Sequence, residues 1–219
     1  MQWDRNLRSQ AAMTGYSVLG QGSAIIWMSA GNSHFSQQVI DELLTLASTS
    51  FSKIIVMAPD QPAEHTFRAL GYEGNEVRKK ARLNANLLQN RARRAIAKLG
   101  DRFTVVEWMD DVANDKEYLA RYEQILKLYE HNDAFRTDAR ETTSKVLISK
   151  SKEVLSDKTL DEGVKYLLKE LAIVGASPKM YDTVSIAYVY HHRWPIYEKF
   201  VDGTYDRKMK KELGSLLAH

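Results

Sequence analysis

Two short apolar runs on either side of one amphipathic segment constrain the fold of this chain more than any other feature. The runs SAIIWMSA, residues 23–30, and KIIVMAP, residues 53–59, are apolar and β-branched, without alternation with polar residues. Such runs are typical of parallel strands that are buried on both faces. Residues 36–49 between them have the apolar spacing of an amphipathic helix. Together the three segments predict a βαβ unit.

The rest of the chain continues this alternation. Residues 64–72 and a basic helix lead to FTVVEWM at 103–109, which is expected to form a third strand. Three helical patterns follow, and a last strand-like run precedes a short helical tail; these four segments are 118–131, 142–155, 161–174 and 184–192. The order predicts an α/β fold, a Rossmann-like three-layer domain with a mainly parallel sheet flanked by helices. No linker divides the 219 residues, so residues 1–219 are expected to form a single domain.

Several classes of protein are disfavoured by what the sequence lacks. There is no cysteine, which excludes disulfides, thiolate nucleophiles and cysteine-ligated metals. The N-terminal segment has no apolar core like that of a signal peptide, and the longest apolar run, AIIWM, is too short to cross a membrane. We therefore expect a cytoplasmic protein with no membrane partner. The glycine fingerprint of dinucleotide-binding folds and the Walker A motif are both missing.

Positive charge is concentrated in one segment. Residues 78–98 contain eight Lys and Arg and no acidic residue, whereas solvated helices usually interleave both signs. With the apolar residues facing the core, the basic residues form one stripe that matches a phosphate backbone. The expected core residues are Leu83, Leu87, Leu88, Ala95, Ile96 and Leu99, and the stripe consists of Lys80, Arg91, Arg94 and Lys98. A merely solvated basic face is the alternative interpretation.

Ser33 follows the first predicted strand directly and precedes a predicted helix. Open α/β sheets place their sites at the carboxyl ends of strands, where backbone amides of the next helix favour a developing oxyanion. Gly31 would let a substrate approach the backbone closely. A serine between strand and helix is, however, a common N-cap. Nucleophile and helix cap therefore remain two hypotheses for Ser33.

Two further segments carry candidate site residues. Tyr166 and Glu170 are four residues apart, so a helix places them on one face, at the flank of an apolar stripe where side chains are half-buried. Such a carboxylate can bind an amine or move its proton, and an ordinary boundary pair is the alternative. Tyr188 and Tyr190 lie on one side of the last predicted strand, with His191 on the other. His191 and His192 have no partner at metal-ligand spacing, so we expect no metal.

These features occur together, and in the same order, in one family that the chain resembles: the cyclodipeptide synthases. The shared elements are a strand followed by GNSHFS, a second strand followed by APDQPAEHTFRALGY, the arginine-rich NRARRAIAKLG, Tyr166-x-x-x-Glu170, and Tyr190-His191 on the last strand. The resemblance covers nearly the whole chain. It implies the fold of the class I tyrosyl- and tryptophanyl-tRNA synthetase catalytic domain without the ATP chemistry, in agreement with the absence of a HIGH-type motif.

The resemblance also implies a reaction. Ser33 would take the aminoacyl group from one aminoacyl-tRNA, and the dipeptide built on it from a second aminoacyl-tRNA would cyclise. Tyr166, Glu170 and Tyr190 would be the other catalytic residues. Substrate contacts would come from Ser29, Gly31, Asn32, Ser36, Tyr188 and His191, and tRNA contacts from Lys80, Arg91, Arg94 and Lys98. The resemblance further implies a monomer that needs neither cofactor nor metal.

The chain departs from the family pattern at two places. Many members have Asn three residues after the nucleophile, where this chain has Ser36, although Tyr190 is followed by His191 as in the branch that carries that Asn. Ser29 stands at a position that is commonly apolar, and Tyr188 lies on the facing strand. We therefore expect a first-residue pocket more polar than one made for Phe or Leu. The alternative functions are a catalytically silent tRNA-binding module and an enzyme using a small nucleotide cofactor.

Overall fold

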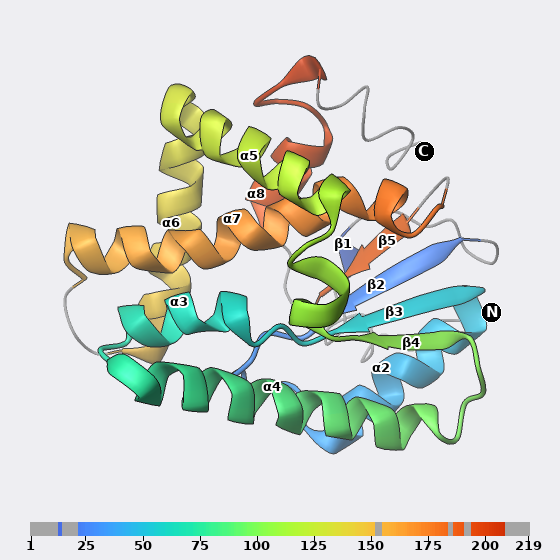
Figure 1. Cartoon of the computed structure of the whole chain (residues 1–219). Coiled ribbons are helices and arrows are strands. Elements are labelled where there is room, and N and C mark those ends of the chain that lie inside the picture. Colours follow the sequence, from blue (N-terminus) through green and yellow to red (C-terminus); the bar gives the residue numbers. More distant parts are fainter. Residues whose placement is uncertain (1–12, 15–21, 152–154, 184–185, 191–193, 209–219) are drawn as a thin grey trace.

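The sheet is the frame of the molecule and has five strands in the order β1-β5-β2-β3-β4 (Figure 1). The computed structural model describes residues 13–14, 22–151, 155–183, 186–190 and 194–208. The four strands β5, β2, β3 and β4 run parallel, and β1 pairs antiparallel with β5 at one edge. The strands span Met13–Thr14 (β1), Ser23–Trp27 (β2), Lys53–Met57 (β3), Phe103–Val106 (β4) and Ile186–Val189 (β5). The predicted Rossmann-like parallel sheet is confirmed.

Helices cover both faces of this sheet, as Figure 1 shows, with α2 and α4 on one face and α5, α7 and α8 on the other. The helices span Gln37–Ser50 (α2), Gln61–Ala69 (α3), Gly74–Ile96 (α4), Lys116–His131 (α5), Asp133–Lys150 (α6), Asp157–Met180 (α7) and Pro195–Val201 (α8). Along β2, Ile25 and Trp27 pack toward α7, whereas Ala24 and Ile26 pack toward α2. Burial on both faces explains why the strands have no alternating polar residues.

The segment expected to form the third strand is shorter than predicted. Strand β4 ends at Val106, and a short π-helix, η1, covers Trp108–Val112. Trp108 is buried among the residues between the sheet and α5, and its ring meets Tyr118 edge to face at 5.3 Å. The chain leaves the sheet where Trp108 packs into the core. Strand propensity alone does not predict such tertiary packing.

The face that the basic helix α4 buries is only partly the one predicted: Leu88 and Ala95 are buried, and Ile96 and Leu99 pack against the core. Leu83 and Leu87 are 68% and 46% exposed, so assigning them to the core was wrong. The buried positions are mostly alanines, at 81, 85, 92 and 95, together with Val77, Leu88 and Gln89. Small side chains let α4 approach α3 and α2 closely, and Leu83 and Leu87 are left on the exposed face beside the basic stripe.

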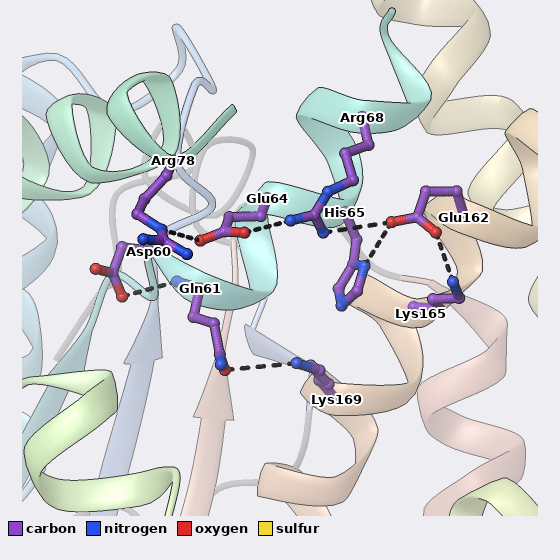
Figure 2. Close-up of polar contacts among 9 residues, drawn as sticks. All are labelled: Asp60, Gln61, Glu64, His65, Arg68, Arg78, Glu162, Lys165 and Lys169. Atoms are coloured by element: carbon purple, nitrogen blue, oxygen red, sulfur yellow. Dashed lines mark hydrogen bonds and ion pairs between the residues drawn. The ribbon is translucent and has the colours of Figure 1, made fainter. Parts of the chain in front are cut away.

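A cluster of charged residues joins α3 to the N-terminal half of α7 (Figure 2). Glu162 of α7 accepts from His65 Nδ1 at 2.8 Å and from Lys165 Nζ at 2.5 Å, and Arg68 lies 3.5 Å from it. Burial lowers the pKa of His65, and these partners together bring the pKa of Glu162 down to about 2 despite partial burial. Gly163 completes the junction, since a Cβ there would lie 2.9 Å from Leu147 of α6. The helix that carries Tyr166 and Glu170 is thus anchored from two sides.

Candidate active site

The loop after β2 turns sharply at Gly31. This residue has φ +77, and a Cβ on it would lie 3.2 Å from the ring of Phe67. Both the backbone conformation and the close approach therefore favour glycine. Asn32 follows: its amide donates to the Ser29 carbonyl at 3.1 Å, and its side-chain oxygen accepts from the His34 amide at 3.0 Å. These bonds hold Ser33 between two fixed neighbours.

The structure separates the two hypotheses for Ser33. Helix α2 is capped by Ser36, whose hydroxyl accepts from the Val39 amide at 3.3 Å. The cap hypothesis for Ser33 is therefore wrong, and Ser33 is exposed. Ser36 was expected among the substrate contacts, but its hydroxyl is occupied at the N-cap. Ser33 is thus an exposed serine in the loop at the carboxyl end of β2 that has no capping role.

Tyr166 is fixed from two directions. Its hydroxyl accepts from Trp27 Nε1 at 2.8 Å and lies 3.0 Å from Ser29 Oγ, and both partners come from β2 and the loop after it. The rings of Trp27 and Tyr166 meet edge to face at 6.4 Å. Burial raises the pKa of Tyr166 well above its ordinary value, so this hydroxyl keeps its proton near neutral pH.

Tyr190, just beyond β5, joins the same network. Its hydroxyl lies 2.8 Å from Ser29 Oγ, and the Asn32 side chain also hydrogen-bonds to it. Burial raises the pKa of Tyr190 as well. Ser29 therefore links the Tyr166 and Tyr190 hydroxyls, and Asn32 brings the network to within one residue of Ser33.

Glu170 is more deeply buried than its place at the flank of the stripe predicted, with 3% exposure. The Tyr188 hydroxyl donates to its Oε1, and the Tyr197 hydroxyl of α8 also hydrogen-bonds to the carboxylate. Burial raises the pKa of Glu170 to about 7, although both hydrogen bonds oppose the shift. A carboxyl that titrates near neutral pH can both accept and return a proton under ordinary conditions.

A cavity of about 250 Å³ brings most of these groups together. Ser29, Asn32, Tyr166, Glu170, Tyr190 and Tyr197 all line it, and Ser33 follows Asn32 directly in the chain. The opposite wall is formed by α6, with Thr143, Lys145 and Lys150 among its residues. The Thr143 hydroxyl is buried and has no hydrogen-bond partner among the described residues.

The other residues predicted for the site have different positions. Tyr188 is buried behind Glu170, and Gly31 shapes the loop. His191 lies outside the described residues. Sequence patterns did not identify Trp27 and Tyr197 as site residues, because each has the spacing of an ordinary core aromatic. Within the described ranges no group of three or more His, Asp or Glu could hold a metal, and no helix there is long and apolar enough to span a membrane.

The basic stripe contacts the serine loop, which we define as residues 28–36 between β2 and α2, and the first residue of α2. Arg91 Nη1 donates to the Phe35 carbonyl at 2.7 Å, and Arg94 donates to Gln37 Oε1 through Nε and Nη2 at 3.1 and 2.8 Å. Lys80 lies over the Tyr72 ring at 4.8 Å, and Lys98 is exposed just after α4 ends. Arg91 and Arg94 therefore also position the N-terminus of α2.

The fold and the site together define a Rossmann-like α/β protein with an exposed serine at the carboxyl end of a central strand, and the residue before that serine lines a cavity with a buried carboxylate and two tyrosines. The family model described as cyclodipeptide synthase matches residues 16–217. The chain therefore belongs to the cyclodipeptide synthase family, and the prediction that it is an enzyme is confirmed. This membership also bears out the expected likeness to class I tRNA synthetases.

Individual relatives agree with this assignment. The chain is 28% identical over 178 residues to a cyclo(L-leucyl-L-phenylalanyl) synthase of Streptomyces noursei, covering 79% of this chain and 74% of that one. A cyclodipeptide synthase structure from Bacillus thermoamylovorans superposes with a TM-score of 0.78, at 21% identity and 91% of each chain. A synthase from Candidatus Glomeribacter gigasporarum, bound to Phe-tRNAPhe, has a TM-score of 0.58 at 14% identity, covering 79% of this chain and 88% of that one.

Proposed function

We propose that this enzyme makes a cyclic dipeptide from two aminoacyl-tRNAs through esters on Ser33. In the first step Ser33 Oγ attacks the carbonyl carbon of the aminoacyl ester, and the tRNA ribose hydroxyl leaves with the serine proton. A serine without an adjacent base is a poor nucleophile, so the activated ester, its positioning and oxyanion stabilisation supply most of the acceleration. The aminoacyl-tRNA bound to a relative supports this class of substrate.

In the second step the amine of the Ser33-bound group forms a peptide bond. Glu170 takes the ammonium proton, and the free amine attacks the ester of a second aminoacyl-tRNA, releasing the second tRNA. An α-ammonium has a pKa of about 7.7–8.0, close to the value of about 7 for Glu170, so the proton moves at little cost. The terminal amine then attacks the Ser33 ester, which closes the ring and restores the serine hydroxyl, with Tyr190 assisting proton transfer.

One observation carries this proposal above the others. Tyr166 and Glu170 of α7 and Tyr190 just after β5 lie far along the chain from the loop after β2, yet they line one cavity with Asn32, the residue before Ser33. A silent tRNA-binding module would explain the basic helix and would leave this convergence without a purpose. Because both esters arrive activated, the route needs no ATP and no metal.

We still propose a polar substrate pocket, but with polar groups other than Ser29 and Tyr188. The Ser29 and Tyr188 hydroxyls contact Tyr166, Tyr190 and Glu170, so they are engaged within the protein. On the α6 wall, Lys145 and Lys150 also line the cavity, and they are the groups left for a polar side chain of an aminoacyl group.

The test is to express the protein in bacteria, identify any diketopiperazine in the medium by mass spectrometry, and repeat the synthesis with purified enzyme and the two matching aminoacyl-tRNAs. We expect product without ATP and with EDTA present, containing at least one polar residue. A product of two apolar residues would refute only the proposed pocket polarity. Soluble protein that binds aminoacyl-tRNA and makes no cyclic dipeptide would establish the silent binding module instead.

The contribution of the basic stripe to tRNA binding is tested by measuring how the binding constant for aminoacyl-tRNA depends on salt concentration. Arg91 and Arg94 are left unchanged because their contacts with Phe35 and Gln37 also hold the start of α2. We expect Lys80→Gln/Lys98→Gln to weaken aminoacyl-tRNA binding and to reduce the slope of log K against log salt by about 2. The matched control is Lys116→Gln/Lys127→Gln on α5, which removes the same charge from the opposite layer of the fold (Figure 1). Equal slopes in the two variants would contradict a phosphate contact at this stripe.

A further inference from the structure

Two tyrosines from separate elements converge on the buried carboxylate of Glu170. Tyr188 lies in β5 and donates its hydroxyl to Oε1, while Tyr197, in the first turn of α8, hydrogen-bonds to the same carboxylate. The proposed reaction uses neither hydroxyl. Both residues are nonetheless almost fully buried, at 8% and 5% exposure.

The two hydroxyls are held in place by ring packing. The rings of Tyr188 and Tyr197 stack at 5.5 Å with an interplanar angle of 18°, and Trp27 lies against Tyr188 at 6.2 Å. Trp27 is itself fully buried in β2. Because the rings are fixed, the donors are already oriented before substrate binds, and little reorganisation is needed.

In the part of the chain that the structure describes, these two hydroxyls are the hydrogen-bond donors to the Glu170 carboxylate. The titratable groups that face Glu170 are Tyr166 of its own helix α7, Tyr188 and Tyr190 of the β5 segment, and Tyr197 of α8. Lys145 and Lys150 of α6 line the same cavity. Among the described residues no Lys, Arg or His forms an ion pair with Glu170.

We propose that Tyr188 and Tyr197 are positioning residues for Glu170, and that their hydroxyls favour the ionised form of its carboxylate and orient it for the ammonium of a bound aminoacyl group. This inference rests on the proposed function, in which Glu170 receives the ammonium proton. It replaces the direct substrate contact expected of Tyr188 and adds Tyr197 to the site.

Each tyrosine hydroxyl lowers the pKa of Glu170 relative to the value that burial alone would give. Hydrogen bonds to a carboxylate favour its charged form, so removing one raises the pKa of Glu170 above about 7. Glu170 acts in its ionised form, and the rate therefore rises with pH through this pKa. For Tyr188→Phe or Tyr197→Phe we expect the acid limb of the rate profile to move up by about one pH unit, a loss of about tenfold at pH 6 with little loss at pH 8.5.

The experiment compares the full-length wild type, the two Phe variants and Tyr122→Phe, a control that removes a half-buried hydroxyl from α5 and leaves the Glu170 carboxylate untouched. Cyclic dipeptide formation from purified aminoacyl-tRNAs is measured between pH 5.5 and 8.5. In parallel, carboxyl ¹³C NMR of glutamate-labelled protein follows the titration of Glu170, assigned with Glu170→Gln. The Phe substitutions keep the rings and their packing.

We expect both the Glu170 titration and the acid limb to move upward in the two variants and to stay in place in Tyr122→Phe. An unmoved Glu170 titration overturns the inference whether or not the enzyme makes product, and so does an equal loss of rate at every pH. Wild-type protein that makes no cyclic dipeptide overturns the proposed function, and the NMR titration then decides separately whether the tyrosines control Glu170.

Discussion

Ser33→Ala is expected to abolish cyclic dipeptide formation, with a loss of at least about 10³-fold. Alanine cannot form the ester that carries both the aminoacyl and the dipeptidyl group, and no other described serine occupies the same place at the end of β2. Ser33 is exposed and does not cap helix α2, so the substitution leaves the fold intact. Product from bacteria expressing either form is quantified by mass spectrometry, with circular dichroism to compare their folding.

The chain contains a matched control three residues further on. Ser36→Ala removes the hydroxyl that caps α2 and should reduce the free energy of unfolding by about 1 kcal/mol, while product continues to form. If the two variants lost activity equally, the assignment of Ser33 as the nucleophile would be wrong. A labelled aminoacyl ester trapped on the wild type and absent from Ser33→Ala would support it directly.

Glu170→Gln is expected to lower product formation by about 10²- to 10⁴-fold. The amide keeps the shape of the side chain but cannot take the ammonium proton, so the second step fails more than the first. The residual rate should also lack the decrease below pH 7 that protonation of Glu170 causes in the wild type. Single-turnover assays with labelled aminoacyl-tRNA, which separate acylation of Ser33 from peptide-bond formation, measure both effects.

The same substitution should stabilise the protein. The pKa of Glu170 is about 7 in the fold, above its ordinary value of 4.5, so the folded state loses stability as pH rises between these two values. Removing the charge should therefore raise the free energy of unfolding by about 1–3 kcal/mol at pH 8, with little change below pH 4.5. Urea unfolding at pH 8 and pH 5 measures the difference. A less stable variant at pH 8 would contradict the assigned burial cost, and Glu130→Gln, on the surface of α5, is the control.

Local pattern determined much of the architecture. The runs around Ile25 and Ile55 are apolar without interruption because both faces of a parallel strand are buried, so the βαβ order and the fold class could be predicted. The four-residue spacing of Tyr166 and Glu170 needed only helix geometry to place them on one face. The position of Ser33 between a strand and a helix could likewise be predicted from the apolar run before it and the helical pattern after it.

Tertiary structure decided which of these residues meet and in what state. Ser36 caps α2 because the turn at Gly31 places the start of the helix after Ser33. Leu83 and Leu87 of α4 are exposed because the buried alanines allow closer helix packing. Complete burial of Glu170, and its two tyrosine partners, depend on β5 and α8, which lie after it in the chain. Sequence periodicity reports the faces of single elements, whereas the burial and proton affinity of a side chain depend on contacts between elements distant along the chain.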